Sequence, residues 1–473
     1  MDYRDNLETF YKRSDYAEIT GLFSGDVRTV QFKAVPYIPR KTKSVSADKT
    51  HLVWEELKNA DHTASDSCLY LHIPFCNLRC TYCGFYKDRA QDDLIEEYSQ
   101  RLVKEIILWK EKDIFQNRTV RAVFFGGGTP SVLTPQQIQK IISVIRKTTV
   151  LSEDCEITFE SSIHDMDEEK FTACLAAGVN RFSFGIQTFD TTLRRSVGRP
   201  DSKETICRQL ESFTHSNARI IIDLIYGLPG QTAQGLLEDL RIAKECGISG
   251  LDLYKLHILP GSPLGKAVEE GRMKYSFTTS QLADMFARGA RLLKEQGYRQ
   301  ISCCHWAADP AEESRYNTMV KAGDDIIACG CSCGGALGPY KLMKLRGIVP
   351  YMNAVDEGKI PVMAFRKQSD DYRLVGALNG QIDRGVLDFA ELNKLHPIPL
   401  AKLLKPVMDK WVEGGLLLPD GETYAVTTEG AFWYKDMART LLIMAETALF
   451  GEITQSEISN DSMMGMARMN NLK

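Results

Sequence analysis

Long hydrophobic runs and an excess of one charge are what this sequence lacks. No stretch approaches the ~18 consecutive apolar residues of a membrane-spanning helix. The 58 Lys and Arg residues nearly balance 62 Asp and Glu residues, for a net charge of −4. This balance argues against a nucleic-acid or polybasic membrane surface. Residues 1–16 are charged and lack the apolar segment of a signal peptide. We therefore expect a cytoplasmic protein with no nucleic-acid and no membrane partner.

Cysteine, by contrast, is abundant. The chain has 13 cysteines among 473 residues, an odd number. In a short secreted domain this content would predict disulfides, but a long chain without a signal peptide favours reduced thiols that serve a metal or a substrate. The length also predicts more than one folding unit, because domains commonly span about 100–200 residues.

A regular alternation of short apolar runs and longer amphipathic segments begins near residue 68. This is the pattern of βα units around a buried parallel sheet. The predicted strands span 69–73, 121–125, 156–160, 181–186, 219–225 and 251–256. The predicted helices span 91–110, 135–148, 167–177, 203–217, 233–246 and 279–296. We expect an α/β fold, a partial (β/α)6 barrel similar to a TIM barrel.

The other segments do not follow this alternation. Residues 1–67 are irregular and predict an N-terminal arm lying on the main domain, whereas 68–350 predict the barrel and a segment that closes it. Residues 370–455 predict a mostly helical, winged-helix-like domain, in which 415–427 form a hairpin with Pro-Asp-Gly at the turn. The Met-rich residues 456–473 predict a flexible tail.

Polar and glycine-rich motifs lie at the ends of the predicted strands. Cys76 follows the first strand and residues 126–130 (GGGTP) follow the second. Glu160 ends the third strand, Gln187 follows the fourth and Asp223 lies near the end of the fifth. The carboxyl ends of parallel strands meet at one edge of a sheet, where such folds hold their chemistry. These residues are therefore expected to converge on one site.

Residues 76–83 carry a C-x3-C-x2-C pattern made of Cys76, Cys80 and Cys83. Three thiolates on a short loop can hold a cubane iron–sulfur cluster and leave one iron open to a substrate. The alternatives are spare thiols or a zinc site, but structural zinc usually needs a second ligand pair, and none follows here. Cys68 precedes the first predicted strand, the wrong end for a fourth ligand.

Residues 70–86, YLHIPFCNLRCTYCGFY, resemble the cluster loop of the radical S-adenosylmethionine (SAM) family. The similar branch contains oxygen-independent coproporphyrinogen III dehydrogenase, a haem chaperone and the anaerobic haem-degrading methyltransferases, the anaerobilin synthases. FGIQTFD (184–190) and DLIYGLPGQT (223–232) also match this branch, and the resemblance spans about residues 68–340. It implies a barrel of the radical SAM type, a 4Fe-4S cluster on the three cysteines and SAM on its open iron. It also implies a low-potential electron donor, flavodoxin-like or NADPH-linked.

The resemblance implies roles for individual residues as well. Positions that hold the cluster-bound SAM match Tyr70, Gly127, Glu160 and Asp223. Positions that hold a second SAM or its equivalent match Tyr82, Gly128, Thr129, Gln187 and Arg199, and a further cofactor contact is expected at Gly334. Catalytic roles are expected for Tyr70, Gln187 and Arg199. Glycines permit close backbone approach, and an arginine can bind a carboxylate bidentately. Each acid taken alone could instead form a salt bridge or cap a helix.

One segment departs from the relatives. Where the chaperone side of the branch carries S-R-H-N-L-x-Y-W, this chain has Tyr316 at the His position and Lys321 at the Trp position. The Gly-rich segment that follows contains alternating cysteines, which would face one side of a strand. The candidate axial ligands for haem iron are His305, Tyr316, Cys329, Cys331 and Cys333. Buried cysteines acting as small hydrophobes, or a second iron–sulfur site, are the alternatives.

This segment and the N-terminal arm make the chain most similar to the anaerobilin synthases. The resemblance implies that haem is opened without oxygen, that SAM donates a methyl group and that iron is released. Coproporphyrinogen III decarboxylation with the same cofactors is one alternative. A haem chaperone that uses little or no SAM is another, although Tyr316 in place of the His of that group argues against it. A structural zinc protein is a third. The haem propionates are expected to contact basic residues of the arm or of the C-terminal domain.

Overall fold

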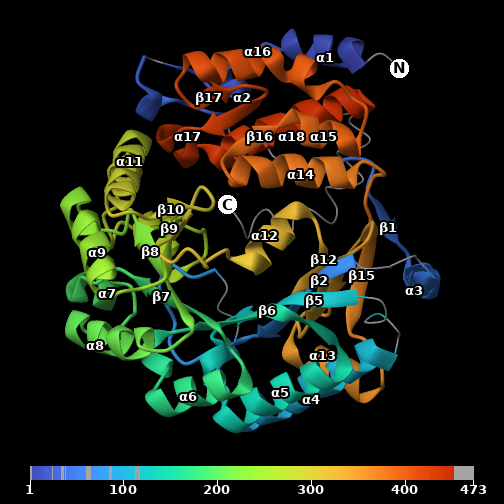
Figure 1. Ribbon diagram of the computed structural model, residues 1–473, viewed down its shortest axis with the longest axis vertical. Coiled ribbons are helices and arrows are strands. Elements are labelled where there is room, and N and C mark those ends of the chain that lie inside the picture. The colour runs from blue at the N-terminus through green and yellow to red at the C-terminus, as the bar shows by residue number, and fades with distance from the viewer. Residues whose placement is uncertain are drawn as a thin grey trace.

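The computed structural model describes residues 3–23, 25–33, 37, 39–59, 65–84, 88–111, 114 and 118–451. A long mixed sheet curls through the lower part of the molecule, and helices with a small three-stranded sheet lie above it (Figure 1). Within these ranges, no helix combines the length and the apolar character needed to cross a membrane.

The predicted βα alternation is confirmed. Parallel strands lie side by side in chain order: β2 (Ser65–Ile73), β5 (Arg118–Gly127), β6 (Val150–Ser161), β7 (Arg181–Gln187), β8 (Arg219–Tyr226) and β9 (Gly250–Lys255). The helices on their outer side are α4 (Asp92–Glu111), α5 (Pro135–Thr148), α6 (Glu168–Ala177), α8 (Lys203–Thr214), α9 (Ala233–Glu245) and α11 (Thr279–Glu295) (Figure 1). The fold is the expected α/β partial barrel.

Helix α5 shows why these segments form helices. Thr134 and Gln137 form a capping box at its start, and Pro135 occupies the first turn, where no backbone N–H is needed. Four isoleucines recur at helical spacing and are buried against the sheet: Ile138, Ile141, Ile142 and Ile145. Burial of such a side chain contributes about 1.5–3 kcal/mol, so this stripe determines which face of α5 packs inward.

The barrel does not close on itself. Beyond β9 the sheet continues antiparallel with β11 (His305–Ala307) and β10 (Arg299–Gln300). At the other edge, β12 (Asp325–Cys329) pairs in parallel with β2. Further out lie β13 (Gly334–Leu337), β14 (Tyr340–Lys344), β15 (Val362–Lys367) and β1 (Lys43–Val45). Helix α12 (Arg315–Ala322) lies in the opening between the two edges (Figure 1).

The alternating cysteines do not form the strand face that their spacing suggested. Strand β12 ends at Cys329, and the chain then turns with left-handed backbone at Gly330 (φ +104°) and Ser332 (φ +61°). A Cβ at Gly330 would lie 2.6 Å from the carbonyl oxygen of His72, so the chain can turn here only with glycine. Cys329, Cys331 and Cys333 therefore do not share one side of a strand.

Buried charges fill the amino-terminal end of the barrel. The Arg181 guanidinium donates to the Glu312 carboxylate at 2.9–3.2 Å. His305 has Nε2 3.0 Å from Glu312 and Nδ1 3.2 Å from Asp252, and the Glu156 carboxylate is 3.9 Å from Arg181. Burial would lower the pKa of His305, but the two carboxylates outweigh it and raise the pKa to about 9. His305 is therefore an imidazolium in a paired network, as buried charges require.

The C-terminal part has the order helix, strand, two helices and hairpin. Its elements are α14 (Tyr372–Asp383), β16 (Val386–Asp388), α15 (Phe389–Leu395), α16 (Leu400–Glu413), β17 (Leu417–Asp420) and β18 (Thr423–Val426). Strand β18 pairs antiparallel with both β16 and β17, which confirms the predicted hairpin and its winged-helix-like surroundings. Helices α17 (Thr428–Phe432) and α18 (Tyr434–Phe450) follow.

The N-terminal arm lies largely on these C-terminal helices. Helices α1 (Tyr3–Tyr11) and α2 (Tyr16–Thr20) pack there, where Trp411 donates to the carbonyl of Thr20 at 2.8 Å (Figure 1). Helix α3 (Thr50–Asn59) instead packs at the sheet edge through Trp54, whose ring lies 5.7 Å from that of Trp109. The arm thus spans both parts of the molecule. The predicted tail, 456–473, lies outside the described residues.

Candidate functional site

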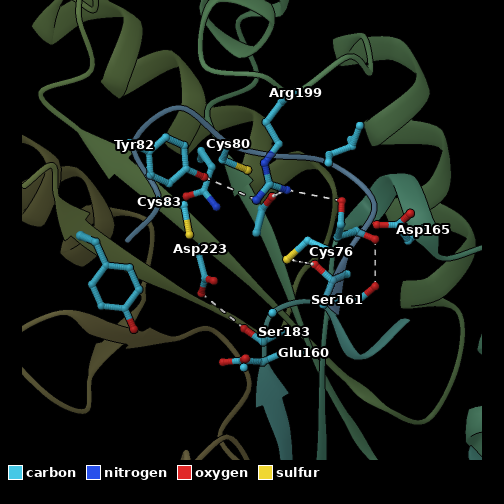
Figure 2. Close-up of a pocket in the computed structure, with 18 residues that line it drawn as sticks. Cys76, Cys80, Tyr82, Cys83, Glu160, Ser161, Asp165, Ser183, Arg199 and Asp223 are labelled. Atoms are coloured by element: carbon cyan, nitrogen blue, oxygen red, sulfur yellow. Dashed lines mark hydrogen bonds between the residues drawn. The ribbon is translucent and has the colours of Figure 1, made fainter. Parts of the chain in front are cut away.

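A cavity of ≈ 280 Å³ opens at the carboxyl ends of the barrel strands. Figure 2 shows side chains from several strands and from the cysteine loop converging on it. The predicted site residues on its wall are Cys76, Cys80, Tyr82, Cys83, Gly127, Gly128, Thr129, Glu160, Gln187, Arg199 and Asp223. The strand-end positions that the sequence singled out therefore do meet in space.

The cysteine loop is anchored by backbone hydrogen bonds. Short strand β3 (Phe75–Cys76) pairs with β4 (Asp88–Arg89), and Ala90 N donates to Cys76 O at 3.1 Å. Farther along, Thr81 N donates to Val197 O at 3.1 Å. All three thiols face the cavity (Figure 2). The loop is thus held at both ends while its sulfur atoms remain available.

Glycine lets the loop pack directly on the end of β5. Gly128 N donates to Ile73 O at 2.7 Å, and Thr129 N donates to Phe75 O at 2.8 Å. A Cβ at Gly128 would lie 2.5 Å from Phe75 O and 3.0 Å from Cys76 Sγ. No larger residue fits without moving the cysteine, which explains the glycine run of the GGGTP motif.

Two half-buried acids, Glu160 and Asp223, line the cavity wall. Burial and the nearby Asp223 raise the pKa of Glu160 to about 8. Burial and Asp252 raise the pKa of Asp223 to about 7, although Ser183 donates to Asp223 at 3.3 Å. Two like charges out of water repel each other, and a bound cation would relieve that repulsion. The pair is suited to an ammonium group or to ribose hydroxyls.

Arg199 and Gln187 form another part of the wall. Arg199 donates to Gly185 O at 2.8 Å and to the Tyr82 hydroxyl at 3.4 Å. Burial would lower the pKa of Arg199, but Tyr82 and Cys80 outweigh it and raise the pKa. Gln187 has φ +71° beside a register shift in β7. Such strained backbone is concentrated at functional sites, and here it aims a polar side chain into the cavity.

Two predicted cofactor residues do not line this cavity. The Tyr70 ring lies 6.1 Å from that of Phe124 and 6.0 Å from that of Tyr316, inside the barrel, and its hydroxyl is 3.1 Å from His72 Nδ1. Gly334 lies on β13, opposite Met343 of β14. Tyr70 is therefore placed to support the site through ring packing.

The candidate haem ligands are not gathered into one set. His305 lines a second, smaller cavity, but both of its ring nitrogens already face carboxylates. Tyr316 stacks on Phe124 at 4.4 Å between ring centres. Cys329 and Cys331 are buried, and Cys333 donates to Gly330 O at 3.3 Å. None of these four lines either cavity.

Other residues of the cavity wall were not predicted. They are Leu78, Ser161, Ser162, Asp165, Ser183, Gly185 and Tyr254. Two had a signal in the sequence. Ser183 lies on the predicted fourth strand with the same alternation as Gln187, and Tyr254 lies near the end of the sixth.

The donor set of the cavity fits a 4Fe-4S cluster together with SAM. Among the described residues, no three His, Cys, Asp or Glu side chains are grouped as ligands of a single ion. A cubane is larger than one ion and takes its thiolates at separate corners. Burial raises the pKa of Cys76 to about 11, and iron would displace that proton. The acids and Arg199 offer partners for the ammonium and carboxylate of SAM.

Comparison with known proteins agrees with this site. Residues 70–243 match the Radical SAM superfamily. The chain is 34% identical over 399 residues to anaerobilin synthase of Escherichia coli O157:H7, covering 84% of this chain and 88% of that protein. It is 30% identical over 272 residues to heme chaperone HemW of Buchnera aphidicola, covering 57% and 70%.

The fold has a solved counterpart. The structure of coproporphyrinogen III oxidase (HemN) from Escherichia coli, described as a radical SAM enzyme, covers 83% of this chain and 93% of its own. Its TM-score is 0.71 and its sequence identity 23%, so it supports the architecture alone. Taken with the cysteine loop and the strand-end cavity, the sequence matches show that the chain belongs to the radical SAM superfamily, in the branch of anaerobilin synthase, HemW and coproporphyrinogen III oxidase.

Proposed function

We propose that this protein degrades haem without oxygen, opening the ring, transferring a methyl group from SAM and releasing iron to give a linear tetrapyrrole. The main support is the similarity to anaerobilin synthase, which combines 34% identity with coverage of 84% of this chain. The match to the HemW chaperone covers 57%, and a coproporphyrinogen III oxidase matches 88% of the chain at a lower identity of 27%. The match to anaerobilin synthase includes sequence outside the barrel core, where a substrate-specific lid or domain would act.

The residues of the cavity are assigned complementary tasks in this proposal. Cys76, Cys80 and Cys83 hold the cluster and leave one iron for SAM. Glu160 and Asp223 receive the ammonium or the ribose. With cluster and SAM bound and an electron supplied, the cofactor pair provides a 5′-deoxyadenosyl radical. The barrel wall orients it and excludes water.

A second SAM or its equivalent is assigned to the wall formed by Tyr82, Gly128, Thr129, Gln187 and Arg199. Arg199 lies beside Tyr82 on the wall of the same cavity as the acids. A guanidinium there can take a carboxylate with paired hydrogen bonds. The assignment accounts for a methyl donor that is separate from the radical source.

SAM binding should strengthen as the pH rises from about 6 to about 7.5. Glu160 and Asp223 have pKa values of about 8 and about 7, so raising the pH ionises acids that then attract the SAM cation. We expect an increase in affinity of up to about tenfold, because an acid with a pKa of about 7 goes from about one-tenth to about three-quarters ionised over this range. Equilibrium binding of SAM to the cluster-loaded protein measures it.

The control for this dependence is a matched pair of variants. Asp223→Asn should weaken SAM binding and flatten the pH profile, whereas Glu238→Gln, on the exposed face of α9, should leave it unchanged. A steep profile that survives Asp223→Asn would argue that other groups bind the cation.

The product of an anaerobic reaction tests the proposed function. Reduced, cluster-loaded protein incubated with haem and SAM should bleach the Soret band, and SAM labelled in its methyl group should yield a labelled linear tetrapyrrole by mass spectrometry. Haem that remains intact, with the cluster loaded and reductant in excess, would overturn the proposal. Coproporphyrinogen III in place of haem tests the decarboxylase alternative. Haem binding without 5′-deoxyadenosine formation would instead identify a chaperone.

A further inference from the structure

A second cavity, of ≈ 180 Å³, lies between the barrel and the C-terminal helices. Its wall comes from β9, the segment before β11, α12, the end of α14 and the start of α18, which approach one another at the open side of the barrel (Figure 1). Polar side chains dominate this wall, among them Ser302, Cys304, Asn317, Thr318 and Tyr434. None of these residues belongs to the proposed cluster or SAM contacts.

Tyr254 connects the two cavities, because it lines both of them. This tyrosine is 41% exposed although it lies on strand β9 of the barrel. A large aromatic ring left exposed inside a barrel is a platform on which a planar ligand can stack. A molecule resting on Tyr254 would therefore reach the SAM cavity at one end and the second cavity at the other.

The charges around the second cavity leave one cation in excess. His305 and Asp252 belong to the paired network at the amino-terminal end of the barrel. Lys321 forms an ion pair with Asp383; burial would lower the pKa of Lys321, but Asp383 outweighs it and raises the pKa. Arg384 is half-buried on the wall, and no ion pair joins it to another described residue. The guanidinium of Arg384 can therefore bind an anionic group of a ligand in this cavity.

We propose that this second cavity binds a carboxylate-bearing side arm of the substrate, with Arg384 as the principal partner and Lys321 and the hydroxyls beside it. The inference rests on the proposed function, in which the substrate is a tetrapyrrole with two propionates. A planar macrocycle then lies on Tyr254, one edge toward the SAM cavity and a propionate in the second cavity.

The size and composition of the cavity favour a side arm over a whole ring. A volume of ≈ 180 Å³ is below the about 300–1,000 Å³ of pockets that enclose a drug-sized ligand. A guanidinium recognises a carboxylate with paired, charge-assisted hydrogen bonds, which gives both affinity and orientation. Binding at this end would determine which edge of the ring faces the radical.

The proposal is tested by changing the protein and the ligand separately. Haem and haem dimethyl ester differ in the charge of the propionates, and their binding to the SAM-loaded protein is followed by the Soret band. We expect Arg384→Gln to weaken haem binding about tenfold or more, as loss of a hydrogen bond to a charged group does. The ester should bind the wild type and the Arg384→Gln protein equally, and more weakly than haem binds the wild type.

The control is Arg373→Gln, which removes the same charge from an exposed position on helix α14, whose C-cap is Arg384. It should leave haem affinity unchanged. SAM also carries a carboxylate, so its affinity is measured in parallel, and we expect Arg384→Gln to leave it unaltered. A loss of SAM binding instead would assign the cavity to SAM and overturn the proposal.

The experiments separate a failure of the carboxylate site from a failure of the proposed reaction. Wild-type protein that binds haem and its dimethyl ester equally would refute the carboxylate site, even if haem is converted to a linear product. An equal loss of affinity for haem and for its dimethyl ester in the Arg384→Gln protein would also refute it. If haem is bound with the expected charge dependence but is never cleaved, the subsite stands and the proposed reaction fails.

Discussion

Replacing Cys83 by serine should abolish SAM cleavage. A hydroxyl is a poor ligand for iron, and a cubane held by Cys76 and Cys80 alone would lose one of its three protein anchors. Changes in the outer shell of a metal site already cost about 10–100-fold, so loss of a direct ligand should lower 5′-deoxyadenosine formation by at least about 100-fold. Iron and sulfide content of the reconstituted protein, and deoxyadenosine release under reduction, measure the effect.

Cys207→Ser provides the comparison. Cys207 is a free, half-exposed cysteine on the outer helix α8, away from the cavity wall. This variant should keep the iron content and the deoxyadenosine formation of the wild type. If Cys83→Ser retained a full cluster and normal SAM cleavage, the loop of residues 76–83 could not be the cluster site.

The second large effect concerns stability. Arg181→Met should destabilise the fold by about 3–5 kcal/mol, because it removes the buried guanidinium between Glu312 and Glu156. The remaining cations, His305 beside Glu312 and Arg219 at 3.7 Å from each acid, do not replace its paired contacts. Both carboxylates are almost fully buried, so water cannot take over the role of the guanidinium. Urea unfolding followed by circular dichroism should show a clearly lower midpoint.

Arg121→Met removes an arginine with comparable ion pairs at the surface. Arg121 lies 3.2 Å from Asp66 and 3.1 Å from Asp154, and all three side chains are at least 37% exposed. Exposed pairs contribute about 0–1 kcal/mol, so the midpoint should hardly move. If both variants lowered the urea midpoint by a similar amount, the buried network would not be what stabilises the amino-terminal end of the barrel.

The two arginines show why one type of residue can have opposite consequences. Each lies at or near the start of a barrel strand, and each faces acids. Along β7 the alternation of side chains directs Arg181 into the barrel, where the dielectric response of water is lost. Arg121 faces solvent, which screens the same charges. The sequence shows the charge but not its environment.

Local sequence patterns were sufficient to predict the barrel core and the convergence of the site. Alternation of apolar runs with helical segments is local, so β5, α5 and their neighbours follow from residues close in the chain. Parallel strands align their carboxyl ends, so Cys76, Glu160 and Asp223 had to meet once the strands were placed.

The arrangement of residues at the open side of the barrel depends on contacts between distant segments and could not be predicted from local patterns. The spacing of Cys329, Cys331 and Cys333 predicted a strand face, but the chain leaves β12 at Cys329 and turns at Gly330 against the backbone of His72. The sequence suggested His305 as a metal ligand, but in the fold its two ring nitrogens face the carboxylates of Asp252 and Glu312. Arg384 and Tyr254 lie 130 positions apart in the chain and became neighbours of one cavity through packing of α14 on the barrel edge. Such contacts depend on how elements that are distant in the chain pack together, and local sequence patterns do not encode that packing.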